Sequence, residues 1–163
     1  MPKTPLAPAE ILTLLRDNPN RIAALTTDLT PVQLRTAPEP AAWSLTDILG
    51  HLRACADVWG GCIATMLLED HPTIRAINPR GWIERTDYRE LAFAPSFAAF
   101  ITQRDALAIT LDALTPVQWE RSATITGAGA PLTRTVHFYA QWLARHERSH
   151  LQEIARVATA VRR

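Results

Sequence analysis

The chain has 163 residues and a nearly balanced charge, which limits the classes of protein to which it can belong. This length suits one domain with one core, and a composition of 47% apolar and 20% charged residues excludes a disordered chain. Seventeen basic and sixteen acidic residues leave a formal charge of +1, so the composition gives no sign of a basic surface for nucleic acid or an anionic membrane. We therefore expect one domain over residues 1–163.

The cysteine content and the lack of a long apolar segment favour a cytoplasmic protein. Cys55 and Cys62 are too few to staple a small secreted domain, and their spacing places them on one face of a helix. The N-terminal residues lack the apolar core of a signal peptide, and no run approaches the roughly eighteen apolar residues of a membrane span. We expect free thiols, no membrane partner and no nucleic-acid partner.

The first predicted helix spans about residues 8–28. The triplet Asn18-Pro19-Asn20 interrupts its pattern, which predicts a kink or two short helices in sequence. The five residues Leu29–Gln33 recur as Leu114–Gln118. We interpret each copy as the end of a helix followed by a short turn with Thr as the N-cap and Pro at the first position, in preference to a duplicated helical hairpin.

A long amphipathic helix is predicted between Ser44 and Asp70. Ser44 is a suitable N-cap, and Asp47 supplies an acid at the third position. The apolar positions recur at spacings of three and four residues and continue through Gly60 and Gly61, so we expect a single helix. The apolar stripe comprises Ile48, Leu52, Cys55, Trp59, Ile63 and Met66.

The middle of the chain predicts a long loop, a third helix and a short hairpin. Residues His71 to Pro95 include three prolines and show no sustained period, which indicates a loop of the kind that often borders a site. Residues Ser96 to Leu114 have the pattern of a helix and lie between two prolines. Residues Ser122 to Pro131 suit a short hairpin.

The last predicted helix has an apolar face that begins at Val136 and ends at Val161. Together the patterns predict four principal antiparallel helices with mostly short links. We therefore expect an all-α fold, an up-down four-helix bundle with a long crossover loop between its second and third helices.

Three of the five histidines are predicted to meet inside this bundle. His146 and His150 are four residues apart, so their rings lie one turn apart on the same helix face. His51 lies at the edge of the second helix's apolar stripe. One ring from one helix and two from a facing helix would give three neutral nitrogen ligands and leave a coordination position open, as catalytic metal sites do. We place His71 and His137 outside this group.

Residues His146–His150 also match the H-E-x-x-H signature of zinc proteases, in which Glu147 would be the general base. We set this interpretation aside, because Glu153 and Arg156 stand where one extended form of the signature requires Gly and His, and an all-helical pattern offers no sheet edge for a peptide. Glu147 either lines the metal pocket as a base or ligand-orienting group, or is solvated or paired between helices. Glu153 is expected to pair with Arg156.

Four other side chains near the predicted site also have alternative roles. Asp47 either caps its helix or orients the ring of His51. Cys55, one turn after His51, is either a small buried apolar residue or a soft fourth ligand or redox group. Trp59 and Trp142 lie at positions around their helices from which their rings could line a pocket beside the metal.

Three motifs in the order found here resemble the DinB superfamily of bacterial metal-binding four-helix bundles. They are Trp43–Leu45, Ile48–Leu52 and His146–Leu151, followed by Ile154 in the next turn. The resemblance covers nearly the whole chain. It implies a four-helix bundle with an unusual long crossover, a protein that is often a homodimer, and a divalent metal held by three histidines.

Carried over to this chain, the resemblance implies that the metal ligands are His51, His146 and His150. Some members of the family resemble thiol-dependent S-transferases that use a low-molecular-weight thiol, and others have been named metal-dependent hydrolases. We therefore expect a divalent-metal-dependent enzyme, with zinc or nickel, of the thiol-S-transferase or hydrolase kind and with a small-molecule substrate. The alternatives are a non-catalytic bundle that binds a metal or a small ligand, and a purely structural dimerisation module.

Overall fold

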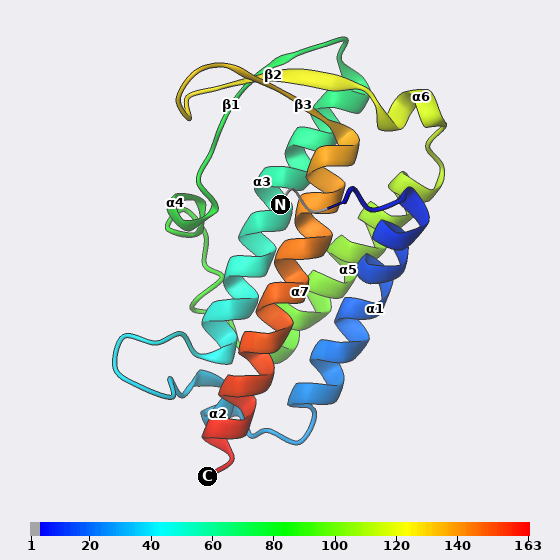
Figure 1. The fold of residues 1–163 in the computed structure, drawn as a ribbon. Coiled ribbons are helices and arrows are strands. Elements are labelled where there is room, and N and C mark those ends of the chain that lie inside the picture. Colours follow the sequence, from blue (N-terminus) through cyan, green and yellow to red (C-terminus); the bar gives the residue numbers. More distant parts are fainter. Residues whose placement is uncertain (1–3) are drawn as a thin grey trace.

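The computed structural model describes residues 4–163, and four long helices form a bundle there (Figure 1). These helices are α1 (Pro8–Thr26), α3 (Leu45–Leu68), α5 (Phe93–Asp112) and α7 (Val136–Val161). The connections contain the short helices α2 (Pro31–Arg35), α4 (Pro79–Ile83) and α6 (Pro116–Trp119), and the strands β1 (Thr73–Arg75), β2 (Ser122–Thr126) and β3 (Leu132–Thr135). The predicted all-α four-helix bundle with a long crossover is confirmed.

The crossover after α3 determines the directions of the helices. The chain leaves α3 at one end of the bundle, returns along its side through β1 and α4, and starts α5 at the other end (Figure 1). As a result α3 runs parallel to α5 and α1 runs parallel to α7, whereas the pairs α1–α5 and α3–α7 are antiparallel. An up-down bundle, as predicted, would have each helix antiparallel to the one before it. Here α3 and α5 are parallel instead, because the crossover spans the length of the bundle.

A three-stranded sheet lies across one end of the bundle (Figure 1). Strands β2 and β3 form the hairpin predicted at residues 122–131, and Gly127, with a φ of 82°, occupies a turn conformation that favours glycine. Strand β1 pairs in parallel with β2. We predicted that the segment from residue 71 to 95 is a loop. The structure shows that it includes β1 and α4.

Two details of the predicted helices differ in the structure. Helix α1 continues through Pro19, so of the two alternatives predicted there, a kink or two short helices, the second is wrong. Helix α5 begins at Phe93 rather than Ser96, and Pro95 lies within its first turn. The backbone N–H groups of a first turn have no partner within the helix, so a proline is tolerated there.

Both copies of the repeated five-residue motif form the capped turn that we predicted. The Oγ1 atoms of Thr30 and Thr115 accept hydrogen bonds from the backbone N–H groups of Gln33 and Gln118, each at 3.3 Å. The two glutamine side chains accept in return from the backbone N–H of each threonine. These caps start α2 and α6, where the chain changes direction at opposite ends of the bundle.

Buried polar residues separate two apolar clusters along the bundle. One cluster includes Leu15, Ile63 and Leu143 and lies toward the sheet, and the other includes Ile22, Leu49 and Ile154 and lies toward α2. Each long helix contributes one buried polar residue between them, and we call this set the polar layer: Asn18, His51, Arg104 and Glu147. Among residues 4–163, no helix combines the length and hydrophobicity that a membrane span requires.

Candidate metal centre

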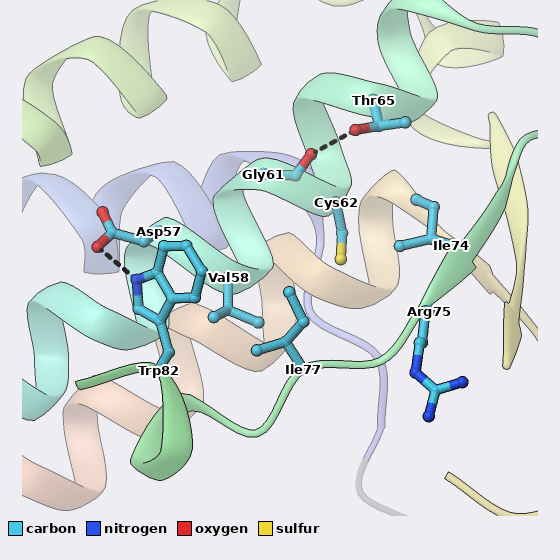
Figure 2. A pocket seen from close by; sticks show the side chains of 9 residues that line it. All are labelled: Asp57, Val58, Gly61, Cys62, Thr65, Ile74, Arg75, Ile77 and Trp82. Atoms are coloured by element: carbon cyan, nitrogen blue, oxygen red, sulfur yellow. Dashed lines mark hydrogen bonds between the residues drawn. The ribbon is translucent and has the colours of Figure 1, made fainter. Parts of the chain in front are cut away.

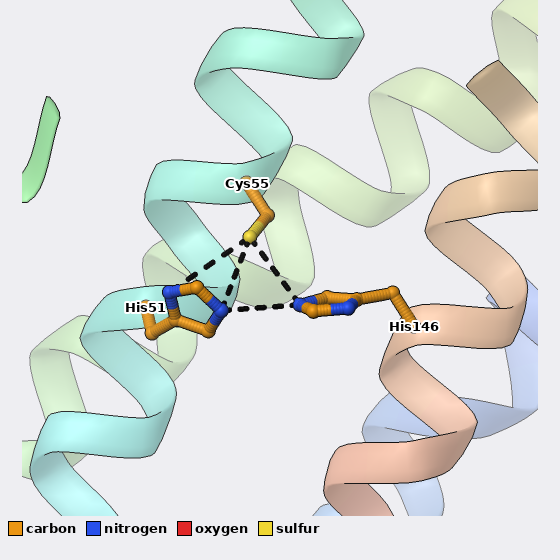
Figure 3. Close-up of side chains that lie close together, drawn as sticks. All are labelled: His51, Cys55 and His146. Atoms are coloured by element: carbon orange, nitrogen blue, oxygen red, sulfur yellow. Dashed lines mark hydrogen bonds between the residues drawn. The ribbon is translucent and has the colours of Figure 1, made fainter. Parts of the chain in front are cut away.

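The antiparallel pair α3 and α7 brings together the histidines that the sequence singled out. His51 lies on α3, and Cys55 lies one turn later on the same helix. His146 and His150 lie one turn apart on α7. Figure 3 shows His51, Cys55 and His146 converging from the two helices.

The Nε2 atoms of His51 and His150 both lie close to the Nε2 atom of His146. His146 Nε2 lies 3.1 Å from His51 Nε2 and 3.1 Å from His150 Nε2. We call His51, His146 and His150 the histidine cluster. The structure thus brings together the three residues predicted as ligands, and their binding of a metal stays a prediction.

The beginning of α3 fixes the helix that carries His51. Ser44 Oγ accepts from the backbone N–H of Asp47 at 3.2 Å, and Asp47 Oδ2 accepts from the backbone N–H of Ser44 at 3.0 Å. This reciprocal pair caps the first turn. Asp47 therefore has the capping role, and no hydrogen bond between Asp47 and His51 is found among the described residues.

Burial keeps two rings of the histidine cluster neutral at physiological pH. Desolvation lowers the pKa of His51 to about 4, with further lowering by repulsion from His150, His146 and two arginines. Desolvation, followed by repulsion from His150, lowers the pKa of His146 to about 4 as well. A neutral imidazole has one nitrogen with a free lone pair, and this is the form that binds a metal.

Hydrogen bonds alone do not satisfy this arrangement, whereas a divalent cation would. A neutral Nε2 atom either donates one proton or accepts with one lone pair, so the three converging Nε2 atoms cannot all be well paired with one another. A cation can accept all three lone pairs at once. The donor set therefore fits a divalent metal, and imidazole ligands suit zinc, nickel or iron.

Glu153 holds the ring of His150, a role that sequence reasoning missed. Its Oε2 atom lies 2.8 Å from His150 Nδ1, whereas no ion pair with Arg156 is found in the part of the chain that the structure describes. A proton on Nδ1 leaves the lone pair on Nε2, which faces the other rings. Carboxylates in this position fix the tautomer and orientation of metal-binding histidines.

Aromatic rings surround the histidine cluster. The ring of Trp59 lies 5.1 Å from that of His146, and Trp142 packs on Trp59 at 5.9 Å. That the two tryptophans wall a pocket beside a metal stays a prediction. Trp43 was not assigned to the site, yet its ring lies 5.0 Å from the ring of His51. These indole rings limit the access of water to the histidines.

Glu147 faces the bundle core instead of the histidine cluster. It is 1% exposed, forms an ion pair with Arg104 of α5, and accepts a hydrogen bond from Asn18 Nδ2 of α1 at 2.9 Å. Of the alternatives that the sequence left open, the geometry favours pairing between helices. A carboxylate bound in this way is not placed to act as the general base of a zinc protease.

The remaining histidines lie outside the cluster, as predicted. His71 Nδ1 is 3.0 Å from Ser122 Oγ near the sheet. His137 Nε2 is 2.8 Å from the carbonyl oxygen of Leu6 and donates to it.

A separate pocket of about 210 Å³ lies between α3 and the crossover (Figure 2). Asp57 stands at one end and accepts from Trp82 Nε1 at 3.0 Å, Tyr88 Oη at 2.6 Å and Gln103 Nε2 at 2.6 Å. This carboxylate therefore ties the crossover to α3 and α5. None of the five histidines lines the pocket.

Comparison with known proteins identifies the family. The family model described as the DinB superfamily matches residues 14–154. The chain belongs to the DinB superfamily. The resemblance noted in the sequence is thus confirmed over most of the chain.

A solved structure shares the DinB fold of this chain. The YfiT protein of Bacillus subtilis is 20% identical and superposes with a TM-score of 0.75 over 96% of this chain and 91% of its own. YfiT is described as a probable metal-dependent hydrolase with an unusual four-helix bundle topology. At 20% identity, this similarity concerns the fold of the two proteins alone. No curated protein matches the chain significantly.

Proposed function

We propose that the protein is a divalent-metal-dependent enzyme whose ion is held by His51, His146 and His150. The observation that carries this proposal is the convergence of their Nε2 atoms, at 3.1 Å from His146 to each of the other two. Membership of the DinB superfamily and the description of YfiT support it.

The surrounding residues have distinct tasks in such a centre. Glu153 holds His150 in the tautomer that presents Nε2. Trp43 and Trp59 pack against the rings and keep the site partly dry, which strengthens electrostatic interactions there. Glu147 and Arg104 anchor α7 to α5 behind the site.

A divalent cation bound here would act as a Lewis acid that lowers the pKa of a coordinated water or thiol toward neutrality. The reaction is accordingly hydrolysis of a small molecule or transfer of a low-molecular-weight thiol to one. The description of YfiT favours hydrolysis. Zinc and nickel are the preferred ions, and the homodimer implied by the family resemblance stays a prediction.

Metal analysis tests the first step of the proposal. We expect protein purified without a metal-affinity tag to hold, or to take up on titration, about one divalent ion per chain. The triple variant His51→Ala, His146→Ala and His150→Ala should hold less than about 0.1 ion per chain. His137→Ala is the matched control on the same helix and should keep the ion. Wild-type protein that takes up no ion would contradict the proposal.

Activity tests the second step. We expect the metal-loaded protein to turn over members of a panel of esters, amides and thiol acceptors, and the His51→Ala variant to lose that turnover. Saturable metal binding without turnover across the panel would instead indicate the non-catalytic alternative.

A further inference from the structure

Cys55 lies against the histidine cluster and has a geometry that simple packing does not require. Its side chain is 1% exposed. Its Sγ atom is 3.5 Å from His51 Nε2 and 3.6 Å from His146 Nε2, and Figure 3 shows it directed at these two nitrogens from the next turn of α3.

These distances match those between the ligands of one tetrahedral ion. Zinc bonds of about 2.3 Å to sulfur and 2.0–2.1 Å to nitrogen place a sulfur and a nitrogen ligand roughly 3.5 Å apart, and two nitrogens roughly 3.3 Å apart. The observed separations are 3.5 and 3.6 Å for sulfur to nitrogen and 3.1 Å for nitrogen to nitrogen. The Sγ atom of Cys55 and the Nε2 atoms of His51 and His146 thus surround one common point, and His150 adjoins this group through its 3.1 Å approach to His146.

A hydrogen bond from the thiol explains less of this geometry. A thiol has one weak donor hydrogen, yet Sγ lies within 3.6 Å of two nitrogens that also face each other. Cys55 is also the one cysteine near the cluster, because Cys62 lies two turns further along α3 and lines the separate pocket.

We propose that the Cys55 thiolate is a fourth protein ligand of the ion, together with the three histidines. This inference rests on the proposed metal site and adds to it a sulfur donor. As the sulfur–metal bond forms, the thiol proton is released to solvent. A mixed nitrogen and sulfur donor set selects zinc, cobalt or cadmium over magnesium and manganese, which prefer oxygen.

The fourth ligand also changes how a substrate can reach the ion. Three histidines alone leave one position of a tetrahedral shell open, whereas four protein ligands fill it. Water or substrate would then bind as a fifth ligand, an expansion that catalytic zinc sites undergo.

Titration with Co²⁺ in the absence of oxygen tests the proposal by absorption spectroscopy, without an activity assay. We expect visible ligand-field bands that saturate at one equivalent, together with a near-ultraviolet band from charge transfer between thiolate and cobalt. The variant Cys55→Ser should lose the near-ultraviolet band and keep the visible bands, since the histidines remain. Cys62→Ser is the matched control and should keep both.

The outcomes separate this inference from the proposed function. Visible bands without a thiolate band in the wild type, or a thiolate band that disappears in Cys62→Ser, would overturn the role of Cys55 and leave the histidine site standing. Absence of any cobalt band would overturn both. Because the chain has two cysteines, the Cys62→Ser result assigns the band even if Cys55→Ser fails to fold.

Discussion

Glu147 follows His146 directly in the sequence, yet the two side chains face different parts of the molecule. His146 points toward α3 and the histidine cluster, whereas Glu147 enters the core and meets Arg104 and Asn18. Successive residues on a helix are about 100° apart, so neighbours in sequence can serve separate environments. The H-E-x-x-H match therefore arises from two unrelated features, a cluster of histidines and a buried ion pair.

Removing the charge of Glu147 should destabilise the protein strongly. Burial lowers the pKa of Arg104 to about 10, so its guanidinium is charged at neutral pH and depends on this partner. We expect Glu147→Gln to lower the free energy of unfolding by about 3–5 kcal/mol in denaturant titrations. The double variant Arg104→Met, Glu147→Leu should recover much of the loss. A cost below about 1 kcal/mol for Glu147→Gln would show that the pair is not important for stability.

Glu153 should affect metal affinity and leave folding nearly unchanged. Its carboxylate orients His150, and loss of such a partner typically weakens metal binding by about 10–100-fold. We expect that decrease for Glu153→Gln in competition titrations with a chelator. Arg156→Gln, on the same helix, is the control and should bind the ion like the wild type. Equal affinities for the two variants would argue against the orienting role.

At the scale of elements, α3 is the helix on which the site depends most, because it carries His51 and Cys55. Its first turn is held by the reciprocal pair of Ser44 and Asp47. We expect Ser44→Ala to lower the free energy of unfolding by about 1 kcal/mol, as measured by thermal or chemical denaturation. Thr102→Ala, on the exposed face of α5, should change it by less than about half of that. Equal costs for both variants would contradict the capping role.

The crossover is attached to the bundle through Asp57, and Tyr88 reports on this attachment. Burial, together with the hydrogen bond to Asp57, raises the pKa of Tyr88 to about 12, and burial raises the pKa of Tyr139 as well. A raised pKa of this kind contributes stability that is present below the normal tyrosine pKa of about 10 and is lost as the pH rises through the folded value.

We therefore expect neither tyrosine of the native protein to ionise near pH 10 in an ultraviolet absorption titration. The chain has two tyrosines, and both should ionise normally in denaturant. Asp57→Asn should lower the pKa of Tyr88 toward its ordinary value. Ionisation of Tyr88 near pH 10, recorded in a Tyr139→Phe variant so that the signal is assigned, would show that the crossover is not held as described.

At the scale of the whole molecule, the polar layer places the histidine cluster at mid-length of the bundle. Apolar clusters lie on both sides of the layer, and each long helix supplies one buried polar residue to it. Such residues are costly in a core unless each finds a partner, so the layer requires a specific alignment of the four helices. The same alignment brings the histidine rings of α3 and α7 together.

Helical periodicity was sufficient to predict the long helices and the positions of His51, His146 and His150 on them. It could not show that Glu147 pairs with Arg104, because these partners are far apart in sequence and neither helix pattern specifies the other. It also missed β1, a three-residue strand whose partner β2 follows much later in the chain. For Glu153, two partners were available within one turn, and the choice of His150 over Arg156 became visible only with the rings in place.

Crystals of the zinc-loaded protein, measured at wavelengths on both sides of the zinc absorption edge, test the central claim most directly. We predict one anomalous peak within bonding distance of the Nε2 atoms of His51, His146 and His150. The peak should be absent from crystals of the His146→Ala variant prepared in the same way. A peak held by other residues, or no peak among these three rings at saturating zinc, would contradict the claim that they form a metal centre.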